Sequence, residues 1–144
     1  VKDLEVDDRP PRGLRTPRTP KYLRWRFSQH PTARYLRVDR EGGIAIVRPN
    51  RRRGRKELVL SDLFGRRVAA ARAAVAGSRA AYTASWFSKG SPERRAIVRA
   101  GLLPVPGVKA LTLVARQLTP LSELGIEVGD LRSWDLALSD LELL

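Results

Sequence analysis

The stretch LRVDREGGIAIVRPNRRRGRKELVLSDL, residues 36–63, decides the fold class because its apolar residues recur with a period of two. Its first part, residues 36–39, alternates apolar and charged side chains, as a strand with one buried face does. Glu41-Gly42-Gly43 is a turn signal, after which Ile44–Arg48 resumes a strand. Glu57–Leu63 then predicts a third, strongly apolar strand. Three adjacent strands with short links indicate an antiparallel meander.

Helical segments are predicted on both sides of this meander. Upstream, Thr19 is a cap, Pro20 stands at the first helical position, and Pro31 ends a short helix. Downstream, residues 66–80 form an Ala-rich stretch that favours a helix.

The remainder of the chain continues the alternation of strands and helices. Tyr82–Phe87 predicts a strand, and Ser91 is the cap of a helix that ends at Gly101. Lys109–Leu118 and Trp134–Ser139 predict two further strands. The sequence therefore predicts an α/β protein.

Length and composition indicate one domain with a real core. The chain has 144 residues, 42% of them hydrophobic, which excludes wholesale disorder. Residues 1–18 are rich in Pro and charge and predict a linker or N-terminal extension, so the domain is expected over residues 19–144. The chain starts at Val and contains no Met, so we expect a fragment or a processed product.

Several classes of function are excluded by what the sequence lacks. It has no Cys and one His, which removes disulfides, thiolate zinc sites, iron–sulfur clusters and multi-histidine metal sites. His30 precedes a proline and is interpreted as a turn residue. No run of about 18 apolar residues and no signal peptide is visible, so we expect no membrane span and a cytoplasmic protein.

The charge is strongly basic and unevenly distributed. The chain carries 28 Lys or Arg against 15 Asp or Glu, a net charge of +13. Residues 1–57 contribute +10 and residues 58–101 contribute +6, whereas residues 102–144 contribute −3. Such a balance predicts attraction to an anion, which is nucleic acid, an anionic membrane surface or a polyphosphate cofactor.

Three local patterns carry a family resemblance. They are the motif LRWRF at Leu23–Phe27 with His30-Pro31 and Tyr35 after it, the strand and helix of Tyr82–Gly101, and the terminal WDLALSD from Trp134. Together they resemble the C-terminal half of bacterial proteins with two tandem GNAT N-acetyltransferase units. The resemblance covers about residues 19–144. It implies a GNAT-like mixed, mostly antiparallel twisted sheet flanked by helices.

The resemblance also implies an activity, which is acyl transfer from acetyl-CoA to the amine of a small molecule or peptide. In the family, a loop R/Q-x-x-G-x-G/A holds the pyrophosphate with backbone N–H groups at a helix start. The matching stretch here is residues 66–71. The cofactor-binding residues expected from the resemblance are Asp62, Leu63, Arg66, Arg67, Ala69 and Ala71.

This sequence departs from the family pattern at two positions. Ala69 stands where a glycine allows close approach of the backbone to phosphate. Ile97 stands where the family has a helix tyrosine that protonates the leaving thiolate. We therefore also expect that this domain is a degenerate partner of a catalytic GNAT unit upstream in the full-length protein.

Glu57 is the candidate catalytic residue, because many GNAT enzymes place a general base at the start of this strand. The alternative for Glu57 is an ordinary strand-end charge paired with a nearby Arg. The alternative for Asp62 is a cap for the Ala-rich helix.

The run Arg51–Lys56 leaves three interpretations open. It is a nucleic-acid-binding loop near aromatic side chains, a docking patch for an acidic partner, a phosphorylated substrate or the upstream domain, or a solvated turn. The aromatic residues involved are Trp25, Phe27 and Tyr35. For the whole chain, the alternatives to an acetyltransferase are accordingly a basic nucleic-acid-binding module and a non-catalytic interaction domain. Trp25, Trp86 and Trp134 are expected in the core.

Overall fold

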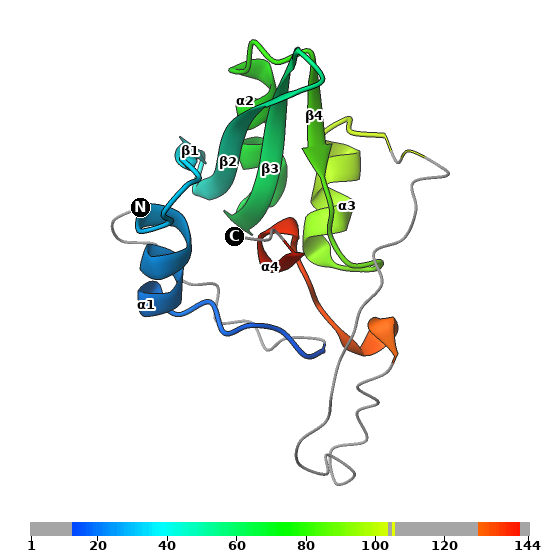
Figure 1. The fold of residues 1–144 in the computed structure, drawn as a ribbon. Coiled ribbons are helices and arrows are strands. Elements are labelled where there is room, and N and C mark those ends of the chain that lie inside the picture. Colours follow the sequence, from blue (N-terminus) through cyan, green and yellow to red (C-terminus); the bar gives the residue numbers. More distant parts are fainter. Residues whose placement is uncertain (1–12, 104, 106–129, 142–144) are drawn as a thin grey trace, which may run out of the picture.

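A mixed four-stranded sheet forms the centre of the protein in the computed structural model, which describes residues 13–103, 105 and 130–141 (Figure 1). The strands lie in the order β1 (Leu36–Arg40), β2 (Gly43–Arg52), β3 (Arg55–Gly65) and β4 (Tyr82–Ser85). The first three are antiparallel, and β4 runs parallel to β3. The predicted α/β class and the antiparallel meander are thus confirmed.

Two tight turns of the same type connect the meander. Glu41 and Gly42 have φ values of 51° and 75°, and Arg53 and Gly54 have φ values of 50° and 77°. Positive φ at both central residues is the signature of a type I′ turn, whose twist matches that of the flanking strands. Because β2 reaches Arg52 and β3 begins at Arg55, the basic run is the tip of a hairpin.

Two of the helices begin at the predicted caps. The hydroxyl of Thr19 accepts the N–H of Tyr22 at 3.1 Å at the start of α1 (Pro20–Leu23), which continues as a π-helical turn, Arg24–Ser28. The hydroxyl of Ser91 accepts the N–H of Arg94 at 3.0 Å at the start of α3 (Pro92–Arg99).

The sheet has a helical layer on each face. Helix α2 (Arg67–Ala76) and α3 pack on one face, and α1 with its π-helical turn covers the lower part of the other (Figure 1). The first layer buries mostly small and aliphatic side chains, and the second buries Leu23, Phe27, Tyr35, Ile46 and Phe64. Strand β3 is buried continuously from Glu57 to Phe64, as expected of a strand covered on both faces.

The prediction of a last strand at Trp134–Ser139 is wrong. Trp134 and Ala137 each form only a single bridge, and residues 138–141 form the short helix α4 (Leu138–Leu141). The side chain of Asp140 accepts the backbone N–H of Ala137 at 2.8 Å, which satisfies a free donor at the helix start. This capping contact outweighs the alternation that suggested a strand. The strand predicted at Lys109–Leu118 lies outside the described residues.

The interpretation of Trp25 as a core residue is also wrong. Its side chain is 51% exposed and packs against Tyr22 with ring centroids 5.8 Å apart. The buried face of this helical segment carries Leu23 and Phe27 instead. Trp86 and Trp134 are half-buried.

The described part of the N-terminal segment is joined to the body of the protein. The N–H of Leu14 donates to the carbonyl of Ser133 at 2.7 Å, and the carbonyl of Leu14 accepts from Asp135 at 2.9 Å. In the described ranges, the structure holds no helix with the length and apolar character that crossing a membrane requires.

Candidate cofactor and catalytic site

Strands β3 and β4 part at a β-bulge. They are paired only over Glu57–Leu60 and Tyr82–Ser85. On the other side of β3, Val47 pairs with Leu60 and Ile46 pairs with Asp62, so Ser61 is the extra residue of the bulge. Beyond this point β4 ends, and the chain turns away from β3. The two parallel strands therefore open toward the end of β3.

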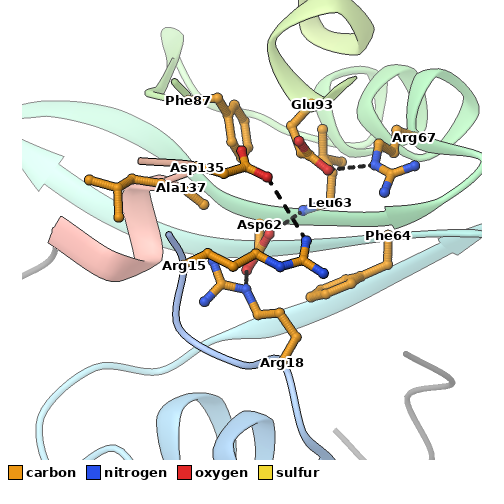
Figure 2. Close-up of a pocket in the computed structure, with 11 residues that line it drawn as sticks. Arg15, Arg18, Asp62, Leu63, Phe64, Arg67, Phe87, Glu93, Asp135 and Ala137 are labelled. Atoms are coloured by element: carbon orange, nitrogen blue, oxygen red, sulfur yellow. Dashed lines mark hydrogen bonds and ion pairs between the residues drawn. The ribbon is translucent and has the colours of Figure 1, made fainter. Parts of the chain in front are cut away.

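Charged side chains surround a small cavity at this opening (Figure 2). Its volume of about 30 Å³ has room for about one water molecule. Apolar walls come from β3, from Phe87 and from the segment before α4. The charged residues around it are Arg15, Arg18, Asp62, Arg67, Glu93 and Asp135.

One arginine holds two carboxylates together at the floor of the opening. The two terminal nitrogens of Arg18 donate to the two oxygens of Asp140, each at 2.7 Å. The Nε of Arg18 lies 3.1 Å from Oδ2 of Asp62, which also accepts the hydroxyl of Ser139 at 3.1 Å. We call these four residues the Arg18 clamp. The clamp joins the N-terminal segment, β3 and α4.

The clamp makes its two carboxylates unequal. Burial raises the pKa of Asp62 to about 6, although the positive charge of Arg18 opposes this shift. Burial acts in the same direction on Asp140, but there the hydrogen bonds and charge of Arg18 outweigh it and lower the pKa. Burial opposes ionisation of Arg18 as well, but the two carboxylates raise its pKa. The single positive charge of Arg18 thus compensates the negative charge of Asp140 fully and that of Asp62 only in part.

Asp62 does not cap the Ala-rich helix, so that interpretation is wrong. Its second oxygen, Oδ1, accepts the N–H of the next residue, Leu63, at 3.0 Å. The N-cap of α2 is Arg66, and no side chain of the described residues caps this helix. The carboxylate of Asp62 instead forms an ion pair with the buried Arg18, which is distant in the sequence. The local spacing of residues could not indicate this contact.

The start of α2 is fixed against the turn between β1 and β2. The N–H of Arg66 donates to the carbonyl of Gly42 at 3.2 Å. A Cβ on Gly43 would lie 2.2 Å from the carbonyl oxygen of Arg66, so only glycine fits there. The first N–H groups of a helix have no partner within it, and at the start of α2 no side chain from the described part of the chain caps them.

An open groove runs beside this helix start. Its volume is about 810 Å³, and it is lined by Arg40, Glu41, Arg66, Arg67, Val68, Ala69, Arg72, Ala73 and Ala76. Four of these side chains are arginines. Uncapped N–H groups, the positive end of the helix dipole and clustered arginines together favour an anion such as phosphate.

The residues expected to bind the cofactor are only partly brought together. Arg66 and Ala69 share the groove. Arg67 also reaches the small cavity, where its Nε donates to Oε1 of Glu93 at 2.7 Å. Leu63 and Ala71 are buried in the core between the sheet and α2.

Glu57 lies at the other end of β3, nine residues before Arg66 and roughly 30 Å away along an extended strand. Its carboxylate is buried and accepts the amide of Asn50 at 2.7 Å. The hydroxyl of Tyr82 is hydrogen-bonded to it as well, and loss of hydration together with this bond raises the pKa of Tyr82. Among the described residues, Glu57 is thus bonded to an amide and a phenol, and not to the Arg of the alternative interpretation.

Sequence reasoning did not identify Asn50 and Tyr82. They are the cross-strand neighbours of Glu57 on β2 and β4, so only the strand register makes them visible. His30 behaves as expected for a turn residue, because its Nδ1 accepts the N–H groups of Thr32 and Ala33 at 3.2 and 2.8 Å.

Within the described residues, no three His, Cys, Asp or Glu side chains gather as metal ligands. Comparison of the chain with known protein families, with curated proteins and with solved structures finds no match. The function is therefore argued from the geometry of the site.

Proposed function

We propose that this chain is a GNAT-like domain that binds acetyl-CoA and takes part in acyl transfer to an amine. One observation carries the proposal: a bulged strand, β3, parts from its parallel neighbour β4 and leads directly into the uncapped start of α2. The order of the elements, an antiparallel meander followed by a parallel crossover through α2 and then α3, supports the same assignment.

The start of α2 is the proposed pyrophosphate site. The N–H groups of Arg67, Val68 and Ala69 point along the helix axis toward the bound anion, and Arg66 adds an exposed cation. The methyl group of Ala69 keeps phosphate farther from the backbone than a glycine would. We therefore expect weaker binding of CoA here than in a GNAT site with the complete loop.

The opening between β3 and β4 is the proposed path of the thioester arm. Its cavity of about 30 Å³ is much smaller than a small-molecule pocket, which is typically about 300–1,000 Å³. Part of the Arg18 clamp, which lines the opening, has to move aside when the arm enters. Binding therefore includes a rearrangement of the N-terminal segment or of α4.

Acetyl-CoA, when bound, supplies an activated acetyl thioester. The amine of the acceptor forms a bond to the carbonyl carbon as the carbon–sulfur bond breaks. Glu57 is the proposed base: it takes the proton of the acceptor nitrogen by way of the hydroxyl of Tyr82, which is partly exposed. Because Ile97 has no proton to give, the leaving thiolate takes its proton from water.

Calorimetric titration of the chain with CoA tests the proposal, with Arg66→Asp as the decisive variant. Aspartate at the N-cap occupies the N–H groups that phosphate needs, and it places a negative charge there. CoA binding should be lost while the helix becomes more stable, so unfolding cannot explain the loss. Arg24→Asp, on the exposed side of the α1 region, is the matched control and should bind CoA as the unaltered chain does.

If the folded chain takes up no CoA, or if Arg66→Asp binds it unchanged, the proposal is wrong. The chain would then have the role of a non-catalytic partner of an upstream GNAT unit. An assay of a longer protein that includes the upstream region would show activity only with both parts present.

A further inference from the structure

The turn between β2 and β3 lies at one end of the sheet, at the top of Figure 1. Strand β1 pairs with β2 only as far as Val47, and β4 pairs with β3 only from Glu57 onward. Among the residues that the structure describes, positions 51–55 therefore form a two-stranded ribbon that no other strand flanks, and the carbonyl of Lys56 accepts the N–H of Ala81 at 2.8 Å, just before β4 begins. The basic side chains of residues 51–56, which we call the basic tip, are Arg51, Arg52, Arg53, Arg55 and Lys56.

The basic tip contains features that destabilise the hairpin. Arg51 is paired with Lys56 and Arg52 with Arg55, and like charges directly opposite each other destabilise a sheet. Arg53 has a φ of 50°, which is uncommon for a residue other than glycine, asparagine or aspartate. A hairpin tip adapted to stability alone would carry opposite charges and a glycine or asparagine at these positions.

No carboxylate neutralises the tip in the part of the chain that the structure describes. All five side chains are exposed, and none of them forms an ion pair with another described residue. The next acidic residue, Glu57, is buried and engaged by Asn50 and Tyr82. An external anion would therefore find five unshared positive charges.

The shape and composition of the tip restrict the kind of anion. It has no apolar side chain that could anchor it in lipid. Pro49 on the free edge of β2 lacks an N–H and so discourages an added strand from a protein partner. Four of the five cations are arginines, whose planar forks match phosphate oxygens. A two-stranded ribbon fits the major groove of B-form DNA, which is about 12 Å wide.

We propose that the basic tip binds duplex DNA by entering the major groove, with its arginines on the phosphates and without sequence preference. This site is separate from the proposed CoA site, because the tip lies at the start of β3 and the groove of α2 lies at its end. The two proposals can therefore fail independently.

The test is fluorescence anisotropy with a labelled duplex DNA of about 20 base pairs over a series of NaCl concentrations. Affinity should fall steeply with salt, with a slope of about −0.9 for each phosphate contacted. The triple variant Arg52→Gln, Arg53→Gln, Arg55→Gln should lose on the order of tenfold in affinity and reduce the slope by about 2–3.

The matched control removes the same charge elsewhere. Lys21→Gln, Arg24→Gln, Arg34→Gln changes three exposed cations in and near the α1 region, at the other end of the molecule (Figure 1). It should leave both affinity and slope nearly unchanged. Equal losses in the two triple variants would mean that only net charge matters, and would overturn the proposal.

Two further ligands distinguish binding in the major groove of DNA from binding to other polyanions. Double-stranded RNA of the same sequence should bind more weakly, because its A-form major groove is too narrow for a ribbon. Equal affinity for this RNA, or binding to vesicles with about 30% anionic lipid in the absence of DNA binding, would also overturn the proposal. Because the triple tip variant removes like-charge pairs, its melting temperature should not fall, which excludes misfolding as a cause.

Discussion

Asp62 shares a single guanidinium with Asp140, and this sharing links protonation to folding. Asp140 receives two hydrogen bonds from Arg18, whereas Asp62 receives only the contact with Nε. With two acids and one base in a buried place, full ionisation of all three leaves an uncompensated negative charge. Asp62 is the member that takes up a proton first, since its pKa lies at about 6.

This raised pKa predicts a pH dependence with a definite sign. The folded protein holds a proton on Asp62 at pH values where the unfolded chain has released it, so Asp62 reduces stability as the pH rises from about 4 to 7. Asp62→Asn removes this titration. Denaturant unfolding should therefore show the variant gaining on the unaltered protein by on the order of 2–3 kcal/mol across that range.

A difference between the two proteins that is constant with pH would contradict this prediction. The opposite slope would mean that Arg18 compensates Asp62 fully. Asp39→Asn, at an exposed position paired with Arg37, is the control and should show no comparable gain.

Removal of Arg18 should be far more damaging than removal of either acid. Arg18→Met leaves two buried carboxylates without their cation, and breaking a buried pair in this way costs about 3–5 kcal/mol. Arg15→Met is the matched control, because Arg15 lies 4.0 Å from Asp135 and is partly exposed. In a denaturant titration, the free energy of unfolding of the Arg15→Met variant should differ from that of the unaltered protein by less than about 1 kcal/mol.

At the scale of elements, the features that local chemistry determines were predictable. The caps Thr19 and Ser91 and the turn at Glu41-Gly42 follow from short motifs whose donors, acceptors and backbone angles lie within a few residues. The strands of the meander follow from a period of two, although β3 is longer than its apolar part.

Features that depend on distant partners could not be predicted. The bulge at Ser61 exists only relative to the register of β2, and the clamp joins residues 122 positions apart. The alternation in Trp134–Ser139 is genuine, but the capping contact of Asp140 decides the conformation there. The same limit explains why Glu57 was identified while its neighbours Asn50 and Tyr82 were not.

The helix start of α2 should show a trade-off between stability and anion binding. Arg66 is a poor N-cap because its side chain cannot accept hydrogen bonds from the helix. Arg66→Asp should therefore stabilise the protein by about 0.5–2 kcal/mol in thermal or denaturant unfolding. A loss of stability would indicate that Arg66 has a structural role that the groove does not reveal.

The contact between the first hairpin turn and α2 should tolerate no side chain. Gly43→Ala would place a methyl group 2.2 Å from the carbonyl oxygen of Arg66, so the turn or the helix start has to shift. We expect a loss of about 2 kcal/mol or more, as for overpacking in a core. Gly54→Ala, which meets nothing within 4 Å, should lose only about 1 kcal/mol through its positive φ.

At the scale of the whole molecule, the two ends of the sheet carry different assignments. The end formed by Gly43 and Gly65 holds the helix start, the groove and the opening between the strands. The other end holds the basic tip and Glu57. Much of the positive charge of the described protein lies at these two ends, so a net charge of +13 reflects two separate anion sites in our proposals.

The two type I′ turns also have a kinetic consequence. Each closes its hairpin across two residues, so the meander can form within microseconds to milliseconds, before β4 or the clamp finds its distant partners. Stopped-flow measurements of folding and unfolding rates should then distinguish a variant in a hairpin turn from a variant in the Arg18 clamp. Gly54→Ala should slow refolding, whereas Arg18→Met should chiefly accelerate unfolding, because its contacts form after the rate-limiting step.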